Sequence, residues 1–125
     1  MARIAIVDDS RLARTFALTV LRKAGHDAFE IDPLSIFEVL KVLREAPPRI
    51  LIMDYLMPGC PGNSLVRACR EDPVLEAMKV VVCTAHRDED VKERLDRLGV
   101  SAFLHKPLDP AALLELVESL APAEG

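Results

Sequence analysis

The residues of this sequence that could do chemistry stand at the ends of short apolar runs. Five polar side chains directly follow such a run or come shortly after one: Asp8, Asp9, Asp54, Thr84 and Lys106. If the runs are parallel strands of one sheet, their carboxyl ends lie along one edge, where ligands bind in open α/β sheets. Three carboxylates, a hydroxyl and an ammonium group would then meet at that edge.

This set of side chains suits phosphoryl transfer. Carboxylates that lie close together repel one another and raise one another's pKa values. Mg²⁺ relieves such repulsion, and it prefers carboxylate oxygens together with waters and phosphate oxygens. An aspartate can form an acyl phosphate, while a lysine and a hydroxyl can neutralise and hydrogen-bond the phosphoryl group. The combination predicts Mg²⁺-assisted transfer of a phosphoryl group onto one aspartate.

Each residue also has an ordinary explanation when it is taken alone. Asp9 or Ser10 could cap a following helix, Asp54 could be a turn residue, Thr84 a cap and Lys106 a solvated surface lysine. The functional interpretation is favoured because all of these residues fall in one predicted layer.

Apolar patterning predicts five strands that alternate with five helices. Unbroken apolar strands indicate a sheet covered on both faces, and the alternation favours a parallel sheet between two helical layers. Only the second strand is polar enough to suggest a sheet edge. The expected strands are 4–7, 27–31, 50–53, 80–83 and 102–104. The first helix has its apolar stripe at Leu12, Phe16, Val20 and Leu21, and Gly25 fits its end.

Composition narrows the class of protein. The chain has 125 residues, of which 50% are hydrophobic and 4% aromatic, and its formal net charge is −4. This length suits one domain with an aliphatic core. The acidic balance argues against direct binding of nucleic acid, because such domains are normally basic.

The cysteines and the hydropathy indicate where the protein works. Cys60, Cys69 and Cys83 are an odd number without C-x-x-C spacing, so we expect reduced thiols in a cytoplasmic protein. We expect no signal peptide and no membrane insertion, since no apolar stretch approaches the length of a membrane span.

Four short motifs occur in order along the chain: Val7-Asp8-Asp9-Ser10, Asp54-Tyr55-Leu56-Met57-Pro58 with Gly62 after it, Cys83-Thr84-Ala85 and Lys106-Pro107. Together they closely resemble the receiver domains of two-component response regulators. The resemblance extends from about residue 3 to 120, and several independent motifs at matching spacing make it specific.

The resemblance implies a role for each acidic residue. Asp54 would accept the phosphoryl group from a phosphohistidine donor, either a histidine kinase or a histidine phosphotransfer protein. Asp8 and Asp9 would bind Mg²⁺ together with Asp54 and the backbone carbonyl of Leu56.

It also implies a switch. Thr84 would hydrogen-bond a phosphoryl oxygen and move toward it, and Lys106 would form an ion pair with the phosphoryl group. The Lys106-Pro107 bond would be cis. Phe103 would rotate inward as Thr84 shifts. The alternative is that Phe103 is a strand residue that simply packs in the core.

The fold implied by the resemblance is a flavodoxin-like, doubly wound (βα)5 α/β fold with a five-stranded parallel sheet in the order 2-1-3-4-5. Residues 1–125 would form a single receiver domain with no output domain, so the downstream target would be a separate protein. Such a domain is no ordinary enzyme, because it assists only its own phosphorylation and autodephosphorylation.

Residues 87–97 predict a charged helix in which only Val91 and Leu95 are apolar, so that a thin stripe anchors it. Its i, i+4 pairs, each contributing about 0.2–0.5 kcal/mol, are Asp88–Lys92, Asp90–Arg94 and Glu93–Arg97. A solvated helix face explains these charges. A lightly anchored helix could also shift, and in the family this helix, the fifth strand and the last helix form the partner surface.

Two positions beside the predicted site depart from the family pattern. Leu56 and His86 flank the site, where many relatives differ, so the lifetime of the acyl phosphate is left open.

A receiver-like binding module that works without phosphorylation is one alternative function, although the retained polar residues argue against it. A phosphohydrolase of similar build is the other, but it commonly needs a second aspartate where this chain has Leu56.

Overall fold

The computed structural model describes residues 2–85 and 89–121. In these residues five strands alternate with five helices, as the patterning predicts. The strands are β1 (Arg3–Val7), β2 (Asp27–Ile31), β3 (Ile50–Asp54), β4 (Lys79–Thr84) and β5 (Ala102–His105). The helices are α1 (Arg11–Lys23), α2 (Ile36–Glu45), α3 (Gly62–Glu71), α4 (Glu89–Arg97) and α5 (Pro110–Leu120).

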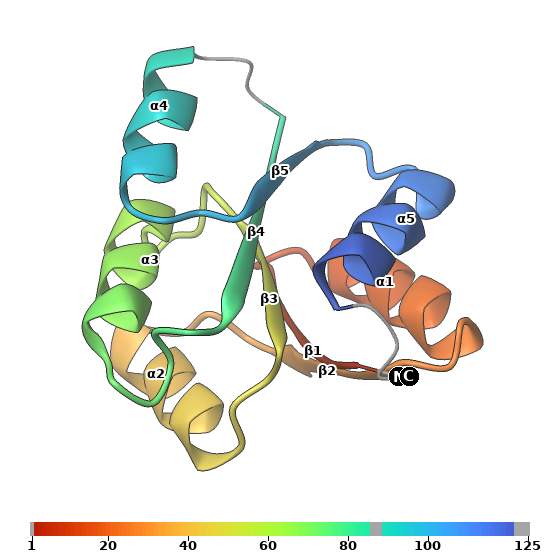
Figure 1. The fold of residues 1–125 in the computed structure, drawn as a ribbon, viewed down its shortest axis with the longest axis horizontal. Coiled ribbons are helices and arrows are strands. Elements are labelled where there is room, and N and C mark those ends of the chain that lie inside the picture. Colours follow the sequence, from red (N-terminus) through yellow and green to blue (C-terminus); the bar gives the residue numbers. More distant parts are fainter. Residues whose placement is uncertain (1, 86–88, 122–125) are drawn as a thin grey trace.

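The strands form one parallel sheet in the order β2-β1-β3-β4-β5 (Figure 1). This order confirms the expected doubly wound topology. The polar β2 lies at one edge, as its sequence suggested. The other edge is the short β5, whose residues are only partly buried or exposed.

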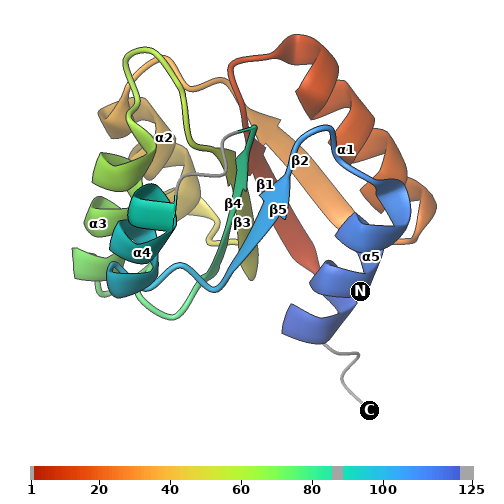
Figure 2. The same cartoon turned by 90° about the horizontal axis from the view of Figure 1, so that it is seen from above.

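Helices cover both faces of the sheet, with α1 and α5 on one side and α2, α3 and α4 on the other (Figure 2). Each face has its own hydrophobic core, and alternate residues of one strand enter different cores. In β1, Ala5 and Val7 pack toward α2, α3 and α4, whereas Ile4 and Ile6 pack toward α1 and α5. The two covered faces explain why the strands are unbroken apolar runs.

Helix α1 exists as predicted, but its buried face is not the predicted stripe. The buried residues are Arg14, Ala17, Leu18 and Leu21. Leu12 is 81% exposed and Phe16 is 38% exposed, so the expectation was wrong at these two positions. Ala17, Leu18 and Leu21 pack into the core on this face of the sheet, whereas Leu12 and Phe16 line a groove together with Pro107 and Leu108.

Helix α4 is lightly anchored, as its sequence suggests. Leu95 is buried, Val91 is half-buried, and the remaining residues of the helix are exposed. The Glu93–Arg97 ion pair forms at 2.8 Å between two exposed side chains, while Arg94 Nε donates to the backbone carbonyl of Asp90 at 3.4 Å. His86 and the predicted Asp88–Lys92 pair involve positions outside the described residues.

The three thiols are all buried and free. Burial raises the pKa of the Cys69 and Cys83 thiols to about 12, which keeps them protonated and unreactive. Within the described part of the chain, no helix has the length and apolar character needed to cross a bilayer.

Arg70 at the end of α3 joins two loops, the one before β4 and the one before β5. Its guanidinium donates to the carbonyls of Gly99 at 3.0 and 2.6 Å, Glu76 at 2.8 Å and Met78 at 2.6 Å. Gly99 has φ +93°, and a Cβ there would approach Arg70 Nε to 2.9 Å. The glycine therefore serves both the turn after α4 and the close passage of the arginine.

Replacing this arginine should weaken the fold. We expect Arg70→Met to lower the free energy of unfolding by about 1–3 kcal/mol, because carbonyls that accept from a charged donor lose their partner. Urea denaturation followed by far-ultraviolet circular dichroism measures the change. The matched variant Arg67→Met, at an exposed position of the same helix, should stay within about 0.5 kcal/mol of the wild type. Equal losses in both variants would contradict the role of Arg70.

Candidate functional site

The register of the sheet brings polar residues from different strands to one edge. Met53 lies opposite Val7, so Asp54 and Asp8 follow neighbouring strand ends. Asp54 lies opposite Cys83, the residue before Thr84. Unbroken strands and this register therefore deliver the side chains of successive loops to a common rim.

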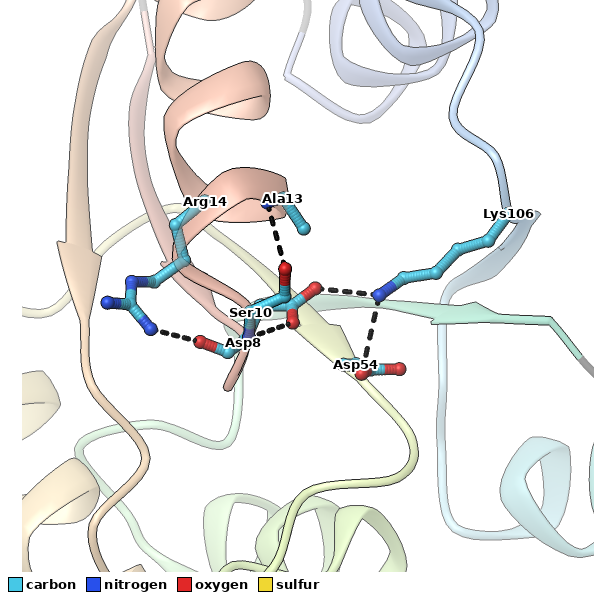
Figure 3. A network of polar contacts seen from close by, with 6 residues as sticks. All are labelled: Asp8, Ser10, Ala13, Arg14, Asp54 and Lys106. Atoms are coloured by element: carbon cyan, nitrogen blue, oxygen red, sulfur yellow. Dashed lines mark hydrogen bonds and ion pairs between the residues drawn. The ribbon is translucent and has the colours of Figure 1, made fainter.

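Asp8 is buried at this rim, and both of its carboxylate oxygens have partners. Oδ1 accepts from the backbone N–H of Ser10 at 2.9 Å, and Oδ2 accepts from Lys106 Nζ at 2.9 Å (Figure 3). Ser10 is also the N-cap of α1, because its hydroxyl accepts from the backbone N–H of Ala13 at 3.2 Å. The start of α1 thus fixes the direction of the Asp8 carboxylate.

Lys106 connects two carboxylates that come from different strands. Its ammonium lies 2.9 Å from Asp8 Oδ2 and 3.3 Å from Asp54 Oδ2, and Figure 3 shows it reaching between them. The backbone N–H of Lys106 donates to the carbonyl of Thr84 at 3.0 Å, which ties the end of β5 to the end of β4. The Lys106-Pro107 bond is cis, as the resemblance implies.

Burial and charge act in opposite directions on this pair. Burial raises the pKa of the Asp54 carboxyl; Lys106 opposes the rise, and the negative charges of Asp8 and Asp9 add to it. Burial alone would lower the pKa of Lys106, but its contacts with Asp8 and Asp54 outweigh burial, so the pKa is raised. The lysine is thus held in its charged form, while the rim opposes full ionisation of Asp54.

Asp8, Asp9 and Asp54 together could hold a metal ion. One oxygen from each lies within 4.8 Å of the other two. The donors are all hard carboxylate oxygens, and only Asp9 is exposed. One lysine leaves this set with a surplus of negative charge. The set fits Mg²⁺, which takes a few carboxylate oxygens and keeps several waters.

The other predicted residues lie around this centre. Thr84 is half-buried at the end of β4. Leu56 is 57% exposed and lines a depression beside Asp9. Phe103 of β5 lies opposite Val82 of β4 and packs against the core on the α4 side. The Lys92 Nζ atom lies 5.6 Å from the centroid of its ring. Phe103 therefore sits between the sheet and α4.

A glycine fixes the loop that follows Asp54. The backbone N–H of Gly62 donates to the carbonyl of Tyr55 at 3.2 Å. A Cβ at this position would lie 2.8 Å from that carbonyl oxygen, closer than side chains tolerate. The loop closed in this way lines a depression together with Asp9.

Sequence reasoning missed Arg14, whose guanidinium is buried directly behind the rim. Its Nη1 donates to the backbone carbonyl of Asp8 at 2.6 Å. Arg14 shares the i, i+3, i+4, i+7 face of α1 with Ala17, Leu18 and Leu21, and a charged residue within a buried stripe is unusual. That signal was ambiguous, because the stripe that begins at Leu12 and Phe16 has helical spacing too.

Comparison with known proteins agrees with this geometry. The family model of the response regulator receiver domain matches residues 4–118. Protein PilH of Pseudomonas aeruginosa is 30% identical over 120 residues, which are 96% of this chain and 98% of PilH. The phosphate regulon transcriptional regulatory protein PhoB of Rhizobium meliloti is 28% identical over 96% of this chain, which spans about half of PhoB, 52%.

Solved structures show the same likeness. The chemotaxis response regulator CheY4 of Vibrio cholerae superposes with a TM-score of 0.87 at 25% identity, covering 96% of this chain and 98% of CheY4. A match over most of the chain, with the acidic rim where the strands end, leads to one conclusion. The chain belongs to the response regulator receiver domain family.

Proposed function

We propose that this receiver domain is a phosphorylation-dependent signalling switch in which Asp54 accepts a phosphoryl group from a histidine kinase or a histidine phosphotransfer protein. The observation that supports this most is the Lys106 ammonium, which contacts both Asp8 and Asp54 at one rim. Receiver domains act in two-component signalling as switches rather than as ordinary enzymes, and this rim supplies the groups that the transfer needs.

In the proposed transfer, an Asp54 oxygen attacks the phosphorus of a phosphohistidine. The O–P bond forms as the N–P bond of the donor breaks, and the donor imidazole leaves. Mg²⁺ held by Asp8, Asp9, Asp54 and the Leu56 carbonyl would neutralise charge on the phosphoryl oxygens. Lys106 already points at Asp54, so its ammonium can pass from the carboxylates to the new phosphoryl group with little rearrangement.

The proposed output lies on the α4–β5–α5 surface. Thr84 would hydrogen-bond a phosphoryl oxygen and shift, and Phe103, which packs beside α4, would turn inward after it. Helix α4 is held by one buried residue, Leu95, so a small displacement at Phe103 can move it. A partner protein that binds this surface would then sense the phosphorylated state.

Two observations weigh against the alternatives. A binding module that works without phosphorylation has no need for Lys106 to be held charged between two carboxylates. A phosphohydrolase commonly needs a second aspartate near the nucleophile, whereas Leu56 offers an exposed apolar side chain there.

Asp54→Asn should abolish labelling by acetyl phosphate or by a phosphohistidine donor, because an amide oxygen cannot form the acyl phosphate. The mass increase of the intact protein measures the labelling. Asp96→Asn, which removes an exposed carboxylate from α4, should be labelled like the wild type. Labelling of Asp54→Asn at the wild-type level would reject Asp54 as the acceptor.

Mg²⁺ should stabilise the protein, and this stabilisation should fade in acid. At 100 times its dissociation constant, an ion that binds only the folded state adds about 2.7 kcal/mol. Because the folded pKa of Asp54 lies above its unfolded value, ionised Asp54 costs stability at neutral pH, and protonation relieves that cost as the pH falls. Mg²⁺ needs the ionised form, so its effect should shrink as the pH falls through this raised pKa.

Chemical denaturation with and without Mg²⁺, at a series of pH values from neutral downward, measures this linkage. Asp54→Asn should be more stable than the wild type without Mg²⁺ at neutral pH, since Lys106 keeps Asp8 as a partner, and it should gain less from the ion. An Mg²⁺ effect that is equal in both proteins and independent of pH would contradict the proposed site.

A further inference from the structure

Helix α1 buries a charge that the proposed transfer does not use. Its buried face consists of Arg14, Ala17, Leu18 and Leu21, and Arg14 is only 8% exposed. The side chain lies behind Asp8, on the far side from Lys106 (Figure 3). A buried guanidinium is costly unless its donors find partners.

Two nitrogens of Arg14 face different strands. Nη1 donates to the backbone carbonyl of Asp8, which follows β1, at 2.6 Å. Nε lies 3.8 Å from Glu30 Oε1 in the edge strand β2. That distance makes an ion pair but no hydrogen bond, and Nε is buried without a hydrogen-bond partner in the described structure. The short contact with Asp8 is thus the one good hydrogen bond described for this guanidinium.

The ion pair with Glu30 adds little stability, because Glu30 is exposed and lies 3.8 Å from Arg14 Nε. Burial of a guanidinium is costly, and the hydrogen bond to Asp8 offsets only part of that cost. A methionine would continue the apolar face formed by Ala17, Leu18 and Leu21. What an apolar side chain cannot do is hold the Asp8 carbonyl in place.

We propose that Arg14 is a positioning residue for the divalent-cation site, and this inference rests on the function proposed above. Asp8 is held at three atoms: its carbonyl by Arg14, Oδ1 by the Ser10 N–H, and Oδ2 by Lys106. When Lys106 moves to a phosphoryl group, Asp8 loses the third contact. Within Asp8, the Arg14 guanidinium contacts only the backbone carbonyl. This contact therefore persists and keeps the Asp8 and Asp9 carboxylates directed at the ion.

Electrostatics and positioning predict opposite signs for the loss of Arg14. A positive charge repels Mg²⁺, so its removal should tighten binding of the ion if charge alone matters. If Arg14 positions the loop, its removal should weaken binding, as loss of an orienting partner behind a metal ligand commonly does, by about 10-fold or more. The direction of the change therefore separates the two effects.

The test is a calorimetric titration of Mg²⁺ into the wild type, Arg14→Met, Arg14→Lys and Arg11→Met. We expect Arg14→Met to bind Mg²⁺ about 10-fold more weakly. The Mg²⁺ affinity of Arg14→Lys should lie between those of the wild type and Arg14→Met, because one ammonium cannot contact Asp8 and Glu30 at once. Arg11→Met removes the same charge from an exposed position of the same helix, and its affinity should be unchanged or slightly higher.

Urea denaturation without Mg²⁺ serves as the second readout, since a merely structural role would lower stability and leave the affinity of the folded protein unchanged. Unchanged or tighter Mg²⁺ binding by Arg14→Met would overturn the proposal. If that variant does not fold, wild-type affinity in Arg14→Lys would do so. Absence of Mg²⁺ binding by the wild type would instead contradict the proposed function itself. Failure of the Arg14 proposal and failure of the proposed function therefore give different results.

Discussion

The contact of one ammonium group with two carboxylates from different strands is the interaction on which the site depends. Lys106 lies 2.9 Å from Asp8 and 3.3 Å from Asp54. Without a cation, three acidic side chains gathered at one edge of a sheet would repel one another. The lysine removes part of that repulsion and leaves a negative surplus that suits a divalent ion. A phosphoryl group on Asp54 would compete for the same ammonium, which links chemistry to conformation.

The parallel sheet allows several charged side chains to gather at one edge. Strands covered on both faces place only their ends at the surface, so polar residues after β1, β3, β4 and β5 share one rim. The surrounding loops are held by specific contacts: the Ser10 cap at the start of α1, the close approach of Gly62 to Tyr55, and the Lys106–Thr84 backbone hydrogen bond. By contrast, α4 is held by a single buried leucine. The rim is thus rigid where charges must meet and loosely packed where movement is proposed.

Sequence reasoning could predict those features that follow from periodicity and strand ends. Five strands, five helices and the meeting of Asp8, Asp54 and Lys106 all follow from where apolar runs stop. The buried face of α1 could not be read correctly, because Leu12 and Phe16 fit helical spacing as well as Ala17 and Leu18 do. The bonds of Arg14 and Arg70 were also out of reach, since Arg14 bonds a carbonyl across the turn from β1 into α1 and Arg70 bonds that of Gly99, 29 residues away.

The central claim is that Asp8, Asp9, Asp54 and Lys106 form one cation-dependent phosphoacceptor centre. The most direct measurement is a crystal structure of the protein with Mn²⁺ and beryllofluoride, in which anomalous scattering locates the metal. The account predicts the metal between the three carboxylates, beryllium bonded to an Asp54 oxygen, and the Lys106 ammonium on a fluorine atom. A metal bound elsewhere, or an unmodified Asp54 with Lys106 still bridging the carboxylates, would contradict it.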